Sequence, residues 1–275
     1  MPIIRRLKLR TSRGIFRAIA HSSVLVTLSC AGNTSFGTGA ISSEITQFES
    51  LVRQGDAADA QFDPERALGF YLKANSERPR DPQLLLKIAK EYSDSTIAIT
   101  DPAEGRLRIE RALKYAERAS ELDPGSPVAL LSQAVCYGKL ADFCDLRKKI
   151  EYARQVKDYA DRALAIDPNY AYAHDVLGQW EYEVAELGRT KRLLVTLVFG
   201  GLPVASIEES IRQLEIAVQL EPKIATHRLA LGFAYLANGE SAKARQSFEI
   251  VISMPYKEIY DPDCHQQAQR ALAGL

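Results

Sequence analysis

The 275-residue sequence is poor in cysteine, and none of its four cysteines stands in a Cys-x-x-Cys pair. Cys30 lies near the N-terminus, and the others are Cys136, Cys144 and Cys264. This pattern excludes a disulfide framework and a zinc site of ordinary ligand spacing. We therefore expect Cys136 and Cys144 to be buried thiols.

Catalytic motifs are also missing. The sequence contains no Gly-x-Ser-x-Gly motif and no phosphate-binding loop. Outside the N-terminal segment the only histidines are His174, His227 and His265, and none has a partner at the spacing of metal ligands. The sequence therefore predicts a protein that is not an enzyme and that holds no cofactor and no metal ion.

The N-terminal segment lacks acidic residues. Its first 43 residues carry six basic side chains, and the first acid of the chain is Glu44. The remainder has 29 basic residues against 35 acidic ones, a net charge of −6. A mildly acidic body does not offer the basic face that nucleic-acid binding requires, so we expect no nucleic-acid partner.

The order of features in this segment is typical of a targeting signal. A basic stretch, residues 5–17, precedes a short apolar run, residues 18–31, which ends in small side chains. We divide the chain into a leader, residues 1–42, and a repeat domain, residues 43–275. The leader favours export to a bacterial periplasm or envelope. A lipoprotein signal, a mitochondrial presequence and a disordered tail on a cytoplasmic protein are the alternatives.

The repeat domain shows internal repetition, which indicates a stacked architecture. Four segments have key residues at spacings of 4, 3 and 5, and a fifth has its proline one residue early. Residues at i, i+4 and i+7 share one face of a helix, and proline stops the helix. The five sets are Ala67, Tyr71, Ala74 and Pro79; Ala112, Ala116, Ala119 and Pro124; Val156, Ala160, Ala163 and Pro168; Ser210, Leu214, Ala217 and Pro222; and Ala244, Phe248, Val251 and Pro255.

A second helical pattern follows each of the first four prolines, most clearly at Leu231, Gly232 and Tyr235. Together the two patterns resemble the tetratricopeptide repeat of about 34 residues. We therefore predict an all-α superhelical solenoid of about five helix pairs with a C-terminal capping helix over residues 261–275. Successive prolines are 45, 44, 54 and 33 residues apart, which predicts insertions near residues 93–105, 139–149 and 184–205.

Three segments of the repeat domain carry a narrower pattern: residues 159–168 (YADRALAIDP), 173–180 (AHDVLGQW) and 203–210 (PVASIEES). On these segments, residues 79–255 resemble the family of the regulator of microtubule dynamics proteins. It implies an all-helical scaffold, association with microtubules in some members, and phospholipid binding by the repeat domain in one.

The concave surface of such a solenoid is the expected binding site. The first helix of each pair lines it in tetratricopeptide domains. The candidate ligand positions are Leu86, Lys90, Val128, Leu131, Val135, Tyr172, Gln179, Tyr182, Leu229, Phe233 and Leu236. Many are apolar or aromatic, which suits an amphipathic helix or lipid chains. Alternatively, the capping helix or the insertions fill the groove themselves.

Two functions remain open from the sequence. The first is a non-catalytic scaffold that binds a protein or peptide in the groove, and that is microtubule-associated if the family role carries over. The second is a phospholipid-binding or lipid-transfer module. In that case the apolar stretch that begins at Leu193 and ends at Leu202 contacts the membrane.

Overall fold

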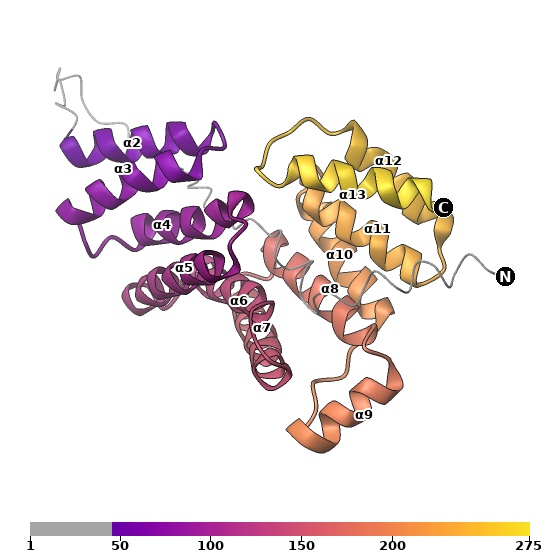
Figure 1. Cartoon of the computed structure of the whole chain (residues 1–275). Helices are drawn as coiled ribbons and strands as arrows, with labels where there is room; N and C mark the ends of the chain where they lie inside the picture. The colour runs from indigo at the N-terminus through magenta and orange to yellow at the C-terminus, as the bar shows by residue number, and fades with distance from the viewer. Residues whose placement is uncertain (1–45) are drawn as a thin grey trace.

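The computed structural model describes residues 46–275, except for the side chains of residues 189–194 (Figure 1). The predicted leader, residues 1–42, lies outside the described residues. Within the described part the chain forms α-helices and one 3-10 helix, with no strand. The all-α prediction is confirmed.

The helices stack as five pairs (Figure 1). The first helices of the pairs are α2 (Gln47–Asp59), α4 (Pro82–Asp94), α6 (Pro127–Ala141), α8 (Ala171–Ala185) and α11 (Ala225–Ala237). Their partners are, in the same order, α3 (Pro64–Glu77), α5 (Pro102–Leu122), α7 (Leu146–Ile166), α10 (Ile207–Leu220) and α12 (Ser241–Ser253). The last helix, α13 (Asp261–Ala273), packs against α11 and α12 as the predicted cap.

Local sequence sets the ends of these helices. Proline occupies the first position of α4, α5 and α6, where its missing N–H costs nothing. The residue before each of these prolines caps the helix, because its side-chain oxygen accepts a backbone N–H of the first turn. The second helix of every pair ends two residues before its repeat proline, as the spacing predicts.

The insertions are mostly helical. The first two lengthen the second helices, since α5 and α7 have 21 residues whereas α3 and α10 have 14. The first insertion also contains the 3-10 helix η2 (Ser95–Ala98). The third forms α9 (Gly188–Phe199), which projects from the stacked body between α8 and α10 (Figure 1).

Small residues let the paired helices approach closely. The repeat alanines, among them Ala67, Ala112 and Ala160, are fully buried between helices. Gly178 of α8 faces Leu214 of α10 so closely that an added Cβ would lie 2.5 Å from the Leu214 Cγ. The thiols of Cys136 and Cys264 are buried, but that of Cys144 is half-exposed because it lies in the turn before α7.

Candidate functional site

The predicted groove positions divide into two groups by exposure. Most of those in the middle of the solenoid are buried: Leu86, Leu131, Val135, Tyr172, Gln179 and Leu229. The half-buried ones are Lys90, Val128, Tyr182, Phe233 and Leu236. The structure brings Tyr182, Phe233 and Leu236 together with one apolar cluster, the one formed by α10 to α13. Leu229 is a buried member of the same cluster.

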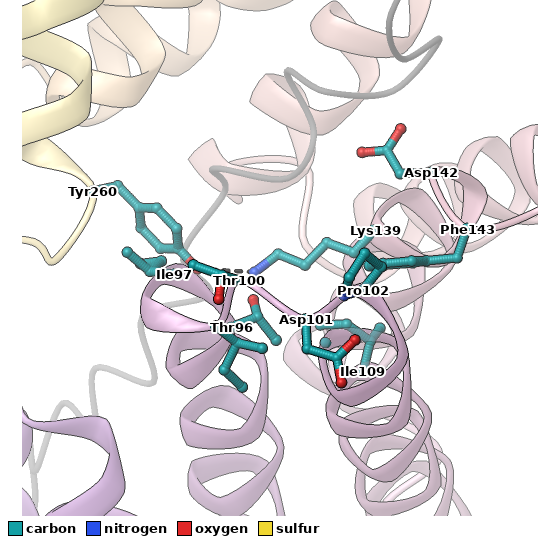
Figure 2. A pocket seen from close by; sticks show the side chains of 12 residues that line it. Thr96, Ile97, Thr100, Asp101, Pro102, Ile109, Lys139, Asp142, Phe143 and Tyr260 are labelled. Carbon is teal, nitrogen blue, oxygen red and sulfur yellow. Dashed lines mark hydrogen bonds between the residues drawn. The ribbon is translucent and has the colours of Figure 1, made fainter.

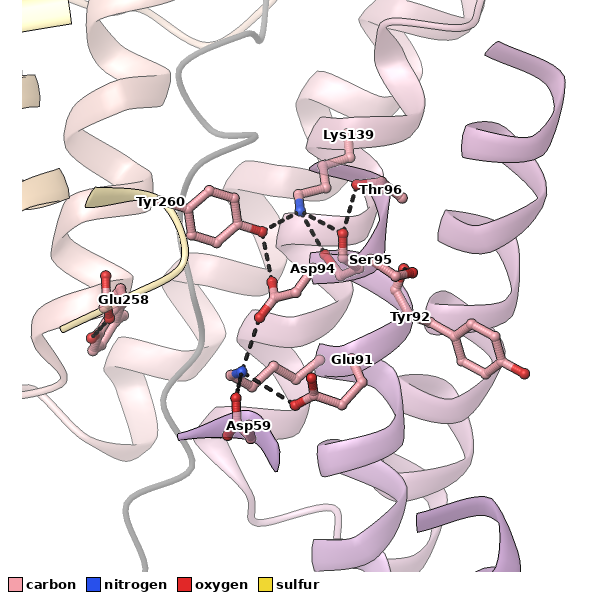
Figure 3. A network of polar contacts seen from close by, with 12 residues as sticks. Asp59, Glu91, Tyr92, Asp94, Ser95, Thr96, Lys139, Glu258 and Tyr260 are labelled. Atoms are coloured by element: carbon pink, nitrogen blue, oxygen red, sulfur yellow. Dashed lines mark hydrogen bonds and ion pairs between the residues drawn. The ribbon is translucent and has the colours of Figure 1, made fainter. Parts of the chain in front are cut away.

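An irregular segment of the chain itself occupies the centre of the concave surface. We call residues 255–260, between α12 and α13, the crossing segment. The Tyr260 hydroxyl donates a hydrogen bond of 2.6 Å to Oδ1 of Asp94 on α4 and accepts one of 2.9 Å from Nζ of Lys139 on α6 (Figure 3). The Tyr172 hydroxyl on α8 donates to Oε1 of Glu258 at 2.8 Å. The crossing segment thus joins three repeats, and it belongs neither to the capping helix nor to the insertions that were the expected alternatives for filling the groove.

Two lysines organise the charges beneath this segment. Lys90 Nζ lies 2.7 Å from Asp59 Oδ1 and 2.9 Å from Asp94 Oδ2, within a largely buried cluster. Lys139 Nζ also donates to the carbonyl and the hydroxyl oxygens of Ser93, at 3.2 and 2.7 Å. Each ammonium group is therefore surrounded by oxygen atoms, as Figure 3 shows for Lys139. This arrangement satisfies buried positive charge, which would otherwise be costly.

Burial changes the protonation of this cluster. It lowers the pKa of Lys139, because desolvation disfavours the ammonium ion. It raises the pKa of Glu258 to about 7, with a further contribution from the nearby Asp261 carboxylate. It also raises the pKa of Glu91 well above the usual range of a glutamate. Burial thus disfavours the charged forms of these three side chains. Lys90 differs, because the carboxylates of Asp94, Glu91 and Asp59 outweigh its desolvation and raise its pKa.

The buried histidines have packing partners. His174 Nδ1 lies 2.6 Å from the Gln213 side-chain oxygen, which links α8 to α10. The ring of His227 packs edge-on against Tyr172 with centroids 4.8 Å apart, and its Nδ1 lies 3.4 Å from Asp175 Oδ2. Among the described residues there is no group of three or more His, Cys, Asp or Glu side chains that could hold a metal ion.

Two cavities border the crossing segment. One of about 340 Å³ lies between the first two insertions, and Lys139 and Tyr260 point toward each other at its inner end (Figure 2). The other, of about 230 Å³, is lined by Lys90 and by Lys257, Glu258 and Ile259. Both combine apolar walls with hydrogen-bonding groups. Recesses with this mixed lining are candidate binding sites.

The third insertion exposes apolar side chains. Leu197 and Val198 on α9 are 75% and 59% exposed, and Val204 beyond it is 90% exposed, whereas Val195 is buried. The side chains of Leu193 and Leu194 lie outside the described part. No helix of the described residues is both long and apolar enough to cross a bilayer.

Sequence reasoning missed the polar residues at the centre of the concave surface: Asp94, Lys139, Glu258 and Tyr260. Lys139 and Asp94 lie at the ends of their helices, beyond the positions that the repeat frame assigns to the groove. One signal was present, because both fall inside the insertions that the proline spacing predicts.

The paired helices, the concave surface and the cap define a tetratricopeptide-like helical-repeat protein. In keeping with this class, the solved structure of a thermophilic tetratricopeptide protein from Thermus thermophilus superposes with a TM-score of 0.61, over 82% of this chain and 99% of that one. The two are 19% identical, so this similarity concerns the fold.

The family model of regulator of microtubule dynamics protein 1-3 matches residues 47–275, and the chain belongs to this family. Regulator of microtubule dynamics protein 1 is 26% identical in Bos taurus over 70% of this chain and in Mus musculus over 82%. Protein 3 of Rattus norvegicus is 24% identical over 78% of this chain. The chain spans 61%, 74% and 46% of the lengths of these three relatives.

These relatives correct one expectation. The leader had favoured export to a bacterial periplasm or envelope, but the matched proteins come from animals. The composition of a basic, acid-free leader is shared by secretory and mitochondrial signals, so it could not separate the two. A mitochondrial location is consistent with the eukaryotic relatives.

Proposed function

We propose that this chain is a non-catalytic scaffold that binds a segment of a partner protein on the concave surface of its repeats and that it associates with microtubules. The observation that supports peptide binding is the crossing segment, a stretch of polypeptide held across three repeats by side chains of α4, α6 and α8. The names of the relatives, regulator of microtubule dynamics proteins 1 and 3, support the microtubule part of this proposal. The half-buried positions Tyr182, Phe233 and Leu236 would extend the same surface toward the C-terminal repeats.

Co-sedimentation with polymerised tubulin tests this function. We expect the full chain to pellet with microtubules and the double variant Tyr182→Ser/Leu236→Ser to bind about tenfold more weakly, because a few anchor residues, tyrosine prominent among them, carry most of the binding energy of an interface. Ile166→Ser, at an exposed apolar position at the end of α7, is the matched control and should pellet like the parent chain. A parent chain that stays in the supernatant, or a double variant that pellets equally, would contradict the proposal.

A second candidate function is binding to phospholipid membranes through α9. The exposed Leu197, Val198 and Val204 support it, because apolar side chains at the end of a projecting helix can enter the headgroup region of a bilayer. The three basic residues at 189–192 precede them in sequence and would favour anionic lipids.

Flotation with vesicles of phosphatidylcholine and phosphatidylserine tests this second candidate. The variant Leu197→Ser/Val198→Ser should reduce flotation of the full chain by about tenfold or more, since each apolar side chain contributes about 1.5–3 kcal/mol when fully buried. Leu107→Ser, at an exposed position on α5, is the control and should float like the parent. If the parent does not float, the membrane candidate is excluded and the protein-binding function is unaffected.

A further inference from the structure

The crossing segment and the capping helix share one apolar cluster but differ in their other contacts. Helix α13 packs through Cys264, Ala268 and Leu272 into the cluster that it shares with α11 and α12, and the ring of Tyr260 is buried in the same cluster. The crossing segment reaches α4, α6 and α8 through hydroxyl, carboxylate and ammonium groups. The hydrogen bonds that join it to these three repeats are therefore polar contacts of the crossing segment alone.

Polar contacts of this kind are exchangeable. A hydrogen bond between two protein groups contributes little net stability when water or another ligand can replace either partner. Burying apolar surface stabilises the folded state, because no comparable interaction with water is lost. Release of the crossing segment from α4, α6 and α8 therefore requires another ligand that supplies the same polar groups and an aromatic ring in place of that of Tyr260. Tyr256 on this segment is already 55% exposed.

The crossing segment also fits its site imperfectly. Oε2 of Glu258 is buried and has no hydrogen-bond partner among the described residues. Buried acceptors without donors weaken the bound state. Both cavities, of about 340 and 230 Å³, adjoin the segment and leave room for a differently shaped occupant.

We propose that the crossing segment is an internal ligand, and that the external ligand of the same surface is a protein segment containing an acidic residue two positions before a tyrosine. This proposal rests on the proposed scaffold function and names the chemistry of its partner. The phenol of the partner replaces that of Tyr260, donating to Asp94 and accepting from Lys139. Its carboxylate replaces that of Glu258 and accepts from the Tyr172 hydroxyl. The internal ligand regulates the site because it must leave before the partner binds.

The test uses the full chain and a labelled peptide with the sequence of residues 254–263. In the variant Glu258→Ala/Tyr260→Ala the internal ligand loses its anchoring groups. We expect this variant to bind the peptide at least about tenfold more tightly than the parent chain, in which the tethered segment competes at an effective concentration in the millimolar range. Fluorescence anisotropy of the labelled peptide measures both affinities.

Altered peptides test the chemistry of recognition. A peptide with phenylalanine in place of Tyr260 should bind the double variant at least about tenfold more weakly, because Asp94 and Lys139 lose their shared partner. A peptide with phenylalanine in place of the exposed Tyr256 is the matched control and should bind like the original. Equal binding of all three peptides overturns the proposal.

Two further outcomes separate this inference from the function on which it rests. A double variant with unchanged helical circular dichroism that does not bind the peptide overturns the internal-ligand proposal, even if the parent chain pellets with microtubules. If the double variant does not fold, Tyr260→Phe keeps the buried ring and removes only the hydroxyl. It should still bind the peptide more tightly than the parent does, and no gain in affinity overturns the proposal.

Discussion

Replacing Trp180 with alanine should lower the free energy of unfolding by about 3–5 kcal/mol, the range for truncating a buried tryptophan. The indole lies on the face of α8 that meets α7 and is fully buried. Its Nε1–H donates a hydrogen bond of 2.8 Å to the carbonyl oxygen of Ala153. The substitution would leave both a cavity and an acceptor without its donor. Denaturant unfolding followed by far-ultraviolet circular dichroism measures the change, since Trp180 is the only tryptophan of the chain.

Trp180→Phe is the control that separates packing from hydrogen bonding. Phenylalanine keeps most of the apolar volume and loses only the donor to Ala153, which should cost about 1–3 kcal/mol. If Trp180→Phe is as unstable as Trp180→Ala, the hydrogen bond to Ala153 accounts for most of the stability that Trp180 provides. A Trp180→Ala variant as stable as the parent would contradict the packing of α8 against α7.

Replacing Gly178 with leucine should lower the free energy of unfolding by about 3 kcal/mol, at the upper end of the range for overpacking. Gly178 lies on the face of α8 that meets α10, where the new Cβ would be 2.5 Å from Leu214 Cγ and 3.2 Å from the backbone oxygen of Ser210. The Leu214 side chain can rotate away from the new Cβ. The carbonyl of Ser210 is part of the backbone of α10, so it can move only if that helix moves. The two helices must therefore separate. Thermal unfolding of the full chain measures the effect as a lower melting temperature.

Gly69→Leu is the matched substitution on α3. An added Cβ at Gly69 meets no atom within 4 Å, so leucine there should leave stability unchanged or raise it by about 1 kcal/mol through helix propensity. Equal melting temperatures for Gly178→Leu and Gly69→Leu would contradict the close approach of α8 and α10.

The expectations from sequence succeeded where a local pattern repeats. The alanine and proline spacing located the second helix of every pair, because a helix face and a helix stop are both encoded within about ten residues. The same pattern located the cap and the three insertions. It did not indicate that the first two insertions would extend α5 and α7, because the exposed face of a helix and a loop have similar polar compositions.

The candidate site was only partly accessible from sequence. Counting positions within each first helix gave a set that assumed an open groove, because no local stretch of sequence shows which distant segment fills it. Tyr260 and Asp94 are 166 residues apart and meet only because the solenoid curves until its C-terminal part reaches its second repeat. Lys139 was not assigned a role because its partner Tyr260 is likewise distant in sequence, by 121 residues.

The sequence by itself determined the helices, their pairing and the family, since each follows from short-range periodicity or from motifs that survive divergence. Only the tertiary structure decided which surface is open and which is occupied. The curvature of a solenoid is the sum of small rotations between successive repeats, and no single segment encodes that sum. Buried charges such as Lys139 and Glu258 become favourable only when that curvature brings their partners within hydrogen-bonding distance.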